Sequence, residues 1–398
     1  MKKILLLIIA VIILLSGCFQ SSHDTSIPES AEPEAPYVKE IMTSFTANFI
    51  LTSNGDVYSW GENEQGVLGL GEELTAKVIT PQKVVLNEPI EKLVTSPLAN
   101  TVFAISEGGN VYGWGANLYK TISDDEVSVF YTPTQIHYDI GVSEIALSHH
   151  IVTILSKNGD VYGYGWNQGD DGIHDEGASF LASDHNLHKI ELPTGSEIAQ
   201  FANSESSRVF LTSAGDVYIQ GAFVQGKMHY DNPTQILFPE KITKIGAMTH
   251  GVVGLSNTGK MYFVGEDRFG IVGDDIASYY VISDAPLRVT KVCDEISDFS
   301  TSLSSIIIRT TDNNFFTWGY NLGKNNAESN AEVIVTPNRL EIDDDSSVIY
   351  YHCGEFSSAY ITEDHSVYVW GSNFQNIFMD EAHESSYRPK KLDFSNYL

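Results

Sequence analysis

The sequence is poor in cysteine and in basic residues. Only three Cys occur among its 398 residues, Cys18, Cys293 and Cys353, and no two form a CxxC pair. This excludes a small disulfide-held scaffold and a cysteine-rich metal site. Lys and Arg number 23 against 52 Asp and Glu, so the formal net charge is -29 at pH 7. Because phosphate groups and anionic lipid surfaces attract basic proteins, nucleic acid and bare anionic membranes are poor partners.

The sequence also lacks the short motifs of common catalytic sites. It contains no GxSxG elbow, no HExxH pair and no P-loop. We therefore expect the chain to work by binding rather than by catalysis, without a cofactor. Hydrophobic residues make up 42% of the chain, which is enough for a large folded core.

The first eighteen residues, MKKILLLIIAVIILLSGC, have the order of a bacterial export signal. Two lysines precede an apolar run from Ile4 to Leu15, which is too short to span a bilayer comfortably. The run ends in Leu-Ser-Gly-Cys, which resembles the lipobox of bacterial lipoproteins. We expect residues 1–17 to be a lipoprotein signal peptide and Cys18 to carry the lipid. The alternative is an uncleaved anchor with an incidental Cys.

The segment that follows, residues 18–36, is rich in Ser, Glu and Pro and has no periodicity. This composition is typical of a flexible, acidic linker. Together with the lipid, it predicts a folded part held at a membrane outside the cytoplasm, at the cell surface or in the periplasm, with the lipid anchor as its contact to the membrane.

A seven-residue segment recurs along the rest of the chain, with copies spaced by about fifty residues, a period typical of propellers and solenoids. The copies are GDVYSWG at Gly55, GNVYGWG at Gly109, GDVYGYG at Gly159, GDVYIQG at Gly215, GKMYFVG at Gly259, NNFFTWG at Asn313 and HSVYVWG at His365.

Each copy belongs to a unit that reads as four strands. An apolar run, a tight turn such as Asn54-Gly55, and an aromatic and β-branched run predict a β-hairpin with a type I′ turn. One further strand candidate precedes each hairpin. Another follows a polar loop and in six units begins near Pro, which suits an edge strand.

Two positions of the copy are nearly constant. An aromatic residue follows the turn at one register, which predicts a packing layer between neighbouring units: Tyr58, Tyr112, Tyr162, Tyr218, Tyr262, Phe316 and Tyr368. The last residue is always Gly, which indicates positive φ or close backbone approach: Gly61, Gly115, Gly165, Gly221, Gly265, Gly319 and Gly371.

Seven such units without helical periodicity predict an all-β fold, a seven-bladed β-propeller over residues 37–398. A ring of stacked sheets covers the apolar faces that one unit alone would expose. The alternative is an open solenoid. Whether the C-terminal RPKKLDF strand completes the first blade, or the first blade is complete alone, stays open.

The units resemble the RCC1 (regulator of chromosome condensation) repeat family. The first unit, LTSNGDVYSWGENEQGVLGLG followed by TPQKV, carries nearly the whole family pattern. Trp60, Trp114, Trp318 and Trp370 hold the family's Trp position, whereas Tyr164, Gln220 and Val264 depart from it. The family's Gly-x-x-His before the second strand is nearly absent. The resemblance therefore supports the fold more strongly than any one activity.

The family includes an exchange factor for a small GTPase, a role that does not suit a protein outside the cytoplasm. It also includes a secreted bacterial β-lactamase inhibitor that binds through loop aromatics. Three classes of function stay open. The first is a surface module that binds a protein, for which the acidity of the chain favours a basic one, and that is itself a monomer. The others are an inhibitor of a β-lactamase or cell-wall enzyme, and an uncharacterised propeller enzyme.

The loops after the repeat Gly hold the candidate binding residues, because aromatic side chains on loops suit protein contacts. The alternative is that each one packs between blades. The candidates are Tyr119, Phe130, Tyr131, Phe223, Phe269, Tyr279, Tyr280, Phe374 and Phe378.

Two segments could bind a metal, although a solvated surface explains both. The loop from Asn167 to Gly177 gathers Asp and Glu at short spacing between Asp170 and Glu176, without the spacing of an EF-hand. The pair His149-His150 precedes a strand. We expect no metal site. Cys293 and Cys353 are expected as free thiols, with a disulfide as the alternative.

Overall fold

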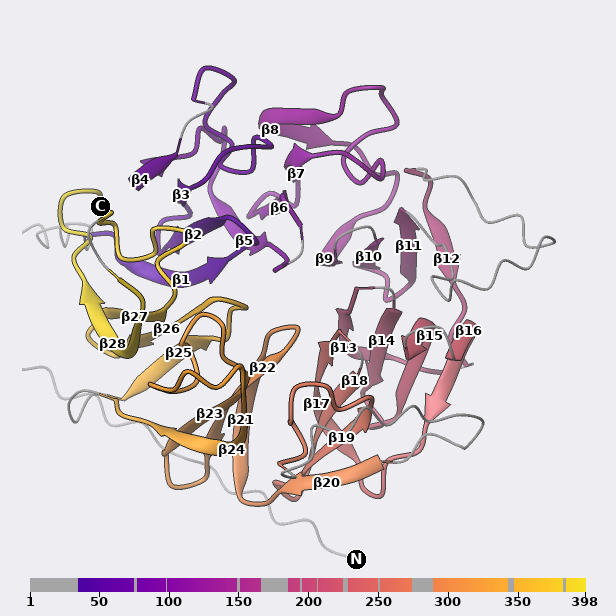
Figure 1. The fold of residues 1–398 in the computed structure, drawn as a ribbon. Helices are drawn as coiled ribbons and strands as arrows, with labels where there is room; N and C mark the ends of the chain where they lie inside the picture. The colour runs from indigo at the N-terminus through magenta and orange to yellow at the C-terminus, as the bar shows by residue number, and fades with distance from the viewer. Residues whose placement is uncertain are drawn as a thin grey trace, which may run out of the picture. The chain divides into compact units, whose positions relative to one another are not determined.

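The repeated units form seven four-stranded antiparallel sheets, which are arranged as the blades of a ring (Figure 1). The computed structural model describes residues 35–74, 77–97, 99–148, 151–165, 185–193, 195–205, 207–224, 228–249, 251–273, 289–342, 347–381 and 384–398. Both the seven blades and their four strands are as the sequence predicts. Residues 36–398 form one compact unit.

In each blade the strands lie in sequence order from the centre of the ring to its rim. The first strands are β1 (Val38–Thr43), β5 (Ile90–Val94), β9 (Val142–Leu147), β13 (Ile198–Asn203), β17 (Ile242–Met248), β21 (Ile296–Thr301) and β25 (Val348–His352). The second strands are β2 (Ala47–Thr52), β6 (Thr101–Ser106), β10 (Ile151–Ser156), β14 (Ser207–Thr212), β18 (Gly251–Ser256), β22 (Ser305–Thr310) and β26 (Ser357–Thr362).

The third strands carry the repeated segment, and the fourth strands form the rim. The third strands are β3 (Val57–Gly61), β7 (Val111–Ala116), β11 (Val161–Gly165), β15 (Val217–Val224), β19 (Met261–Gly265), β23 (Phe315–Tyr320) and β27 (Val367–Gly371). The fourth strands are β4 (Val78–Lys83), β8 (Val129–Ile136), β12 (His188–Ile190), β16 (Met228–Ile236), β20 (Val289–Cys293), β24 (Val333–Leu340) and β28 (Ser386–Leu392).

The predicted hairpins are present, but their turns are not of type I′. In the first blade, the amide of Gly55 donates to the carbonyl of Thr52 at 3.0 Å, and Gly55 has φ 81° while Asn54 is not in the left-handed region. A type I′ turn needs positive φ at both central residues. In the sixth and seventh blades, Asn313 and His365 stand at the position of Gly55 and have a left-handed φ of 63° each.

Every blade has a β-bulge at the same place, between its first and second strands. The register shifts near the second residue of the first strand, for example between Val38 and Glu40 and between Ile242 and Lys244. A bulge re-aims the side chains that follow it. The residue after the bulge is polar in all seven blades: Glu40, Lys92, Glu144, Gln200, Lys244, Asp298 and Tyr350.

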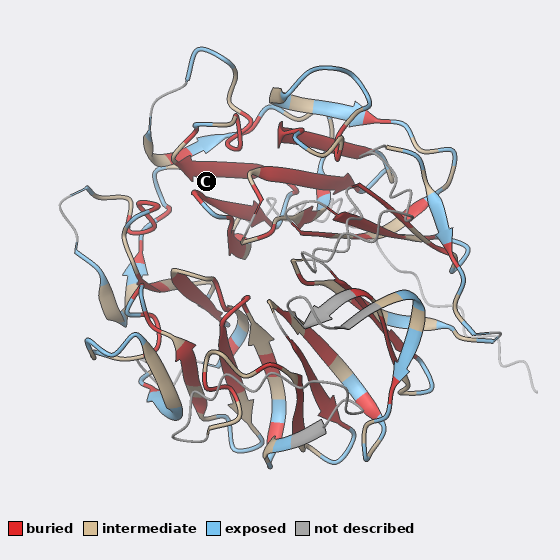
Figure 2. Ribbon diagram, turned by 45° about the vertical axis from the view of Figure 1, so that its right-hand side comes forward, coloured by how far each residue is buried: buried red, intermediate tan, exposed pale blue. Residues whose placement is uncertain are grey.

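Burial falls from the middle of each blade to the rim (Figure 2). All six residues of β2, β6 and β26 are buried, because neighbouring blades cover both faces of these strands. Most residues of the rim strands are exposed or partly buried, as in β24. The Pro-bearing strands therefore lie at the edge, as predicted.

Apolar clusters join each blade to the next. Tyr112 and Trp114 of the second blade pack in one cluster with Phe49 and Leu51 of the first. Tyr262 packs with residues of β14 and β15 in the same way. The aromatic layer between units that the sequence predicts is therefore present at these interfaces.

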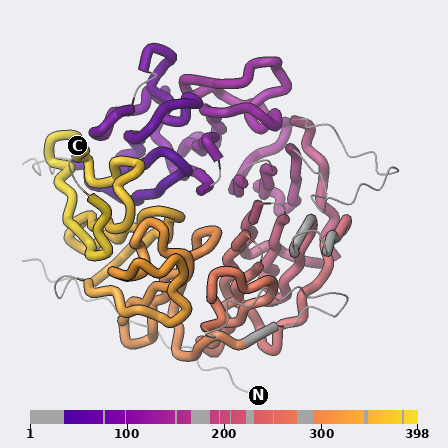
Figure 3. Tube along the Cα trace, in the orientation of Figure 1, coloured from indigo at the N-terminus to yellow at the C-terminus, as the bar shows by residue number. Residues whose placement is uncertain are grey.

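The ring closes without sharing a strand between its two ends. The C-terminal strand β28 belongs to the seventh blade, and the first blade is complete with β1–β4, which settles the question that the sequence left open. Figure 3 shows the last blade, in yellow, beside the first, in indigo. Contacts across this seam include Trp60 Nε1 donating to the Asn376 carbonyl at 2.9 Å and Tyr350 Oη donating to the Ile41 carbonyl at 2.9 Å.

The expected signal peptide, Cys18 and most of the expected linker lie outside the described residues. Within the described ranges, we find no helix long and apolar enough to cross a membrane.

Candidate functional site

The connections of each blade leave on two opposite faces of the ring. Because successive strands are antiparallel, the loops after the first and third strands lie on one face, which we call the loop face. The connections after the second and fourth strands lie on the other, the turn face. Outside the fourth blade, where β15 and β16 are joined by residues 225–227, the loops after the third strands are the long ones, such as residues 117–128 and 321–332. The sequence of these loops can vary without disturbing the sheets.

The long loops are held by a polar side chain two residues after the repeat Gly. In the second blade, Asn117 Oδ1 accepts the amides of Ile122 at 2.9 Å and Ser123 at 3.2 Å, while its Nδ2 donates to the Val127 carbonyl at 2.9 Å. Asn63, Asn321, Asn373 and, in the fifth blade, Asp267 accept loop amides in the same way. Sequence reasoning missed this Gly-x-Asn pattern, although its regular spacing was visible.

The repeat Gly itself makes a close approach that no side chain would permit. Gly115 has φ 94°, and a Cβ on it would lie 2.1 Å from the Asn100 carbonyl oxygen. All seven have positive φ, from 94° to 139°. The loop therefore leaves the third strand in a fixed direction.

In the repeats that have the Trp, its indole nitrogen donates a hydrogen bond to the long loop of the preceding blade. Trp114 Nε1 donates to the Val67 carbonyl at 2.9 Å, Trp318 Nε1 to Ile271 at 3.1 Å, and Trp370 Nε1 to Asn325 at 2.8 Å. In the third blade Tyr164 replaces Trp, and its hydroxyl donates to the Thr121 carbonyl at 2.8 Å. These loops are thus fixed from both sides.

One position on the rigid loops, immediately after the Asn or Asp, differs between blades. It is the exposed Glu64 in the first blade and the partly buried Arg268, paired with Glu266 at 2.8 Å, in the fifth. It is hydrophobic in the second, sixth and seventh blades. Leu118 is 56% exposed, Leu322 63% and Phe374 55%. Phe374 was a predicted candidate. Leu118 and Leu322 were missed, and the register of the Gly-x-Asn pattern would have found them.

Further aromatic residues of the loop face adjoin Phe374. The ring centroids of Phe356 and Phe374 lie 6.3 Å apart, and those of Phe45 and Phe356 lie 6.0 Å apart. Phe45 is 41% exposed. It also borders a cavity of about 290 Å³ that Leu118 and Tyr119 line. Tyr119, a predicted candidate, thus lies beside this group.

The other predicted loop aromatics lie elsewhere. Phe269 packs against Tyr320 of the next blade, with centroids 5.8 Å apart, and a Cβ on Gly66 would lie 3.1 Å from Tyr131. Phe130 is partly buried between blades. Phe378 is 6% exposed. Phe223 lies at the end of β15, and Tyr279 and Tyr280 lie outside the described residues.

The described loops of this face are strongly acidic. Their cations are Lys77, Lys120, Arg268 and Lys324. Their carboxylates are Glu62, Glu64, Glu72, Glu73, Asp124, Asp125, Glu126, Glu205, Glu266, Asp267, Glu328, Glu332, Glu355, Asp380, Glu381 and Glu384. Lys77 pairs with Glu62 at 3.4 Å, Lys120 with Glu126 at 3.4 Å and Arg268 with Glu266 at 2.8 Å, so three of these four cations are already paired with carboxylates.

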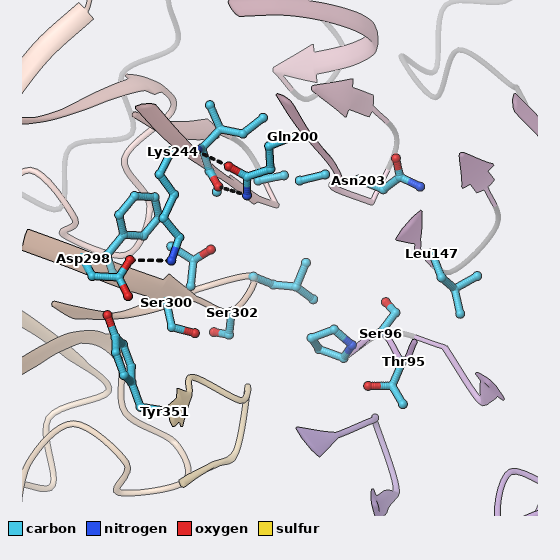
Figure 4. A pocket seen from close by; sticks show the side chains of 18 of the residues that line it. Thr95, Ser96, Leu147, Gln200, Asn203, Lys244, Asp298, Ser300, Ser302 and Tyr351 are labelled. Carbon is cyan, nitrogen blue, oxygen red and sulfur yellow. Dashed lines mark hydrogen bonds and ion pairs between the residues drawn. The ribbon is translucent and has the colours of Figure 1, made fainter. Parts of the chain in front are cut away.

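The central channel offers a second hollow, a cavity of about 510 Å³ (Figure 4). Its polar groups are largely paired across blades. Lys244 Nζ lies 2.6 Å from Asp298 Oδ1, and Gln200 exchanges two hydrogen bonds of 2.9 Å with the Ile245 backbone. Tyr351 points towards Asp298 (Figure 4), and burial raises the pKa of its phenol. Among the described lining residues, Asp298 is the one carboxylate, so the cavity does not gather the acids that hydrolysis needs.

Two partly buried ionisable groups lie near the seam and the loop face. His352 Nε2 accepts the Thr43 amide at 3.3 Å across the seam, and burial lowers the pKa of His352 to about 4. Glu355 accepts a hydrogen bond from Ser304, and burial raises the pKa of Glu355. Desolvation is therefore the main influence on the charge state of both groups.

The metal and disulfide alternatives find no support in the described residues. No cluster of three or more potential metal ligands occurs among them. The loop from Asp170 to Glu176 and the pair His149-His150 lie outside the described ranges. Cys293 and Cys353 are free thiols, as expected, and burial raises the pKa of each to about 12.

Comparison with known proteins agrees with this architecture. Residues 54–95 match the family model of the regulator of chromosome condensation (RCC1) repeat. The Ultraviolet-B receptor UVR8 of Arabidopsis thaliana is 26% identical over 355 residues, which cover 85% of this chain and 78% of the receptor. The human E3 ubiquitin-protein ligase HERC2 is 23% identical over 390 residues, 93% of this chain but 8% of the ligase.

Solved structures share the fold at low identity. Prp20p from Saccharomyces cerevisiae aligns with a TM-score of 0.71 and 16% identity, covering 91% of this chain and 88% of that one. Human WBSCR16 aligns with a TM-score of 0.70 and 16% identity, over 85% and 94% of the two chains. The fold therefore defines a seven-bladed β-propeller with a loop-bearing face. Its repeats are similar to the RCC1 repeat, whose family model matches residues 54–95.

Proposed function

We propose that this chain is a lipid-anchored protein-binding module, which works outside the cytoplasm and binds a basic partner as a monomer. The observation that supports this most is the loop face, where rigid loops present exposed hydrophobic side chains among carboxylates. These loops are held by Asn side chains and by hydrogen bonds from Trp of the next blade, so they lose little conformational entropy when a partner binds. More of the contact energy therefore appears as affinity.

The comparisons support the same class of function. Prp20p of Saccharomyces cerevisiae has binding properties to Gsp1p and histones, and yeast RCC1 has been crystallised bound to Kap60. Propellers of this kind therefore serve as binding platforms elsewhere. Basic partners would suit the acidic loop face of this chain, because opposite charge speeds encounter and suppresses wrong partners.

The proposed interaction can be tested on intact cells that express the full chain. A photo-crosslinking amino acid replaces Glu64, Leu118 or Glu381 on the loop face, and Val85 or Leu237 on the turn face. We expect protein adducts from the loop-face positions and none from the two turn-face controls, as read by mass spectrometry. If no position on either face gives an adduct, the module does not act by binding a protein.

The anchor is tested separately by mass spectrometry of the mature N-terminus. We expect a lipidated Cys18 and recovery of the protein with membranes. The variant Cys18→Ser should lose the lipid and shift to the soluble fraction. A wild-type chain that keeps Met1 and carries no lipid would contradict the proposed location.

A further inference from the structure

Several hydrophobic side chains of the loop face follow one another across four blades. Leu322 of the sixth blade lies in a loop packed on Phe356, since a Cβ on Gly323 would lie 2.1 Å from the Phe356 carbonyl oxygen. Phe356 adjoins Phe374 and Phe45, and Phe45 shares a cavity wall with Leu118 and Tyr119. We call these six residues the apolar arc. It runs from the sixth blade through the seventh and first to the second, over the seam.

The fold does not require hydrophobic residues at these positions. Leu118, Leu322 and Phe374 occupy the same place in their repeats as Glu64 and Arg268, which are charged. The backbone of the loop is held by the preceding Asn or Asp in every one of these cases. A hydrophobic side chain that is more than half exposed at such a position leaves apolar surface in water, which is a common mark of an interaction site.

Carboxylates border the arc along its length. Asp124, Asp125 and Glu126 follow Leu118 in the same loop and are exposed. Glu328 and Glu381 lie in the loops of the sixth and seventh blades. A partner that fits this surface combines apolar anchor side chains with Lys or Arg on either side of them.

We infer that the apolar arc is the docking surface for a protein segment that presents aromatic or aliphatic anchors flanked by basic residues. This inference rests on the proposed function and assigns it to one sector of the loop face. A second copy of the chain does not fit, because two such acidic borders would repel each other.

The test selects peptides from a random display library on the immobilised full chain, and then measures their affinity as purified peptides. We expect the selected peptides to carry hydrophobic residues next to Lys or Arg. The variants Leu322→Ser and Phe374→Ser should bind them about tenfold more weakly or worse, as expected for central anchors. Binding should also weaken as salt is raised from low to high ionic strength.

The matched controls are Val85→Ser and Leu237→Ser, which remove side chains 80% and 77% exposed on the turn face. They should leave the affinity within about twofold of the wild type, as expected for distant surface sites. All four positions are exposed, so thermal unfolding followed by circular dichroism is expected to show folded variants.

Three outcomes would overturn the inference. They are failure to enrich any peptide, enrichment of peptides without basic residues, and affinities that Leu322→Ser and Phe374→Ser leave unchanged. A dimer in sedimentation that Phe374→Ser dissolves would assign the arc to a second copy instead. If the peptides bind away from the arc while loop-face crosslinks still form on cells, the proposed function stands and this surface assignment alone fails.

Discussion

Two partly buried residues, His352 and Glu355, should contribute to the pH dependence of folding stability in opposite directions. His352 and Glu355 lie close together in the chain, on and just after β25, and desolvation is the main cause of both pKa shifts. Burial favours the neutral form of each group, so the two act in opposite senses. As the pH falls, protonation of His352 in the unfolded chain lowers the stability of the folded protein. Protonation of Glu355 in the folded protein raises that stability.

His352 should lower stability as the pH falls. Its folded pKa is about 4 against an ordinary 6.5, so only the unfolded chain takes up this proton between those values. The stabilisation is complete above pH 6.5 and is lost towards pH 4, by roughly 2–3 kcal/mol. In His352→Gln this part of the pH dependence should disappear, as measured by urea unfolding at several pH values. Parallel curves for variant and wild type would contradict the assignment.

Glu355 should behave in the reverse way. Its folded pKa lies above the ordinary 4.5, so the wild type gains stability as the pH falls through the folded pKa towards 4.5. Glu355→Gln keeps an acceptor for Ser304 without the buried charge. It should be more stable than the wild type at pH 7, and this difference should shrink as the pH falls towards 4.5. Calorimetry at both pH values checks this, and a less stable variant at pH 7 would be the opposite result.

At the scale of the strand and loop, the sequence predicted the regular parts well. Turn residues beside β-branched runs define hairpins locally, so the Asn54-Gly55 hairpin and the Pro-led rim strands were predictable. The predicted type I′ turn was wrong, because the turn type depends on how many residues between the two strands are left without ladder hydrogen bonds. The exposure of Leu322 and the packing of Phe269 were not predictable, because both depend on a neighbouring blade.

The hydrogen bond from the Trp or Tyr of a third strand to the long loop of the preceding blade should contribute measurably to the free energy of unfolding. Tyr164→Phe removes the hydroxyl that bonds to the Thr121 carbonyl and to the Tyr138 hydroxyl, and Trp114→Phe removes the donor to Val67. Because each leaves a buried carbonyl without its partner, we expect losses of about 1–3 kcal/mol in urea unfolding. A cost below about 0.5 kcal/mol in both, the range of ordinary surface changes, would show that this hydrogen bond does not hold the loop.

At the scale of the whole molecule, the seam between the seventh and first blades depends on side chains. Asn48 Nδ2 donates to the Gln375 carbonyl at 2.6 Å, and Gln375 Nε2 donates to the Phe45 carbonyl at 2.9 Å. Phe394, beyond the last strand, meets Trp60 edge to face with centroids 6.1 Å apart. The number of blades was predictable from the repeat count. The manner of closure was not, because an N- or C-terminal strand can complete either blade.

Loss of a seam contact should therefore weaken the ring as a unit. Phe394 is 6% exposed, and Phe394→Ala should cost about 3 kcal/mol through lost packing and a cavity. We also expect a broader thermal transition, because an opened ring lets blades unfold separately. The control Leu237→Ala, at an exposed site, should melt as the wild type does. A sharp, unshifted transition for Phe394→Ala would mean that closure does not depend on this contact.

Each blade is made from one uninterrupted stretch of chain, and this has a consequence for how such molecules change over generations. A duplication or deletion of about fifty codons adds or removes a whole sheet, never half of one. Descendant proteins can therefore have rings with more or fewer blades, or one blade replaced by another with different loops, while the remaining sheets keep all their strands.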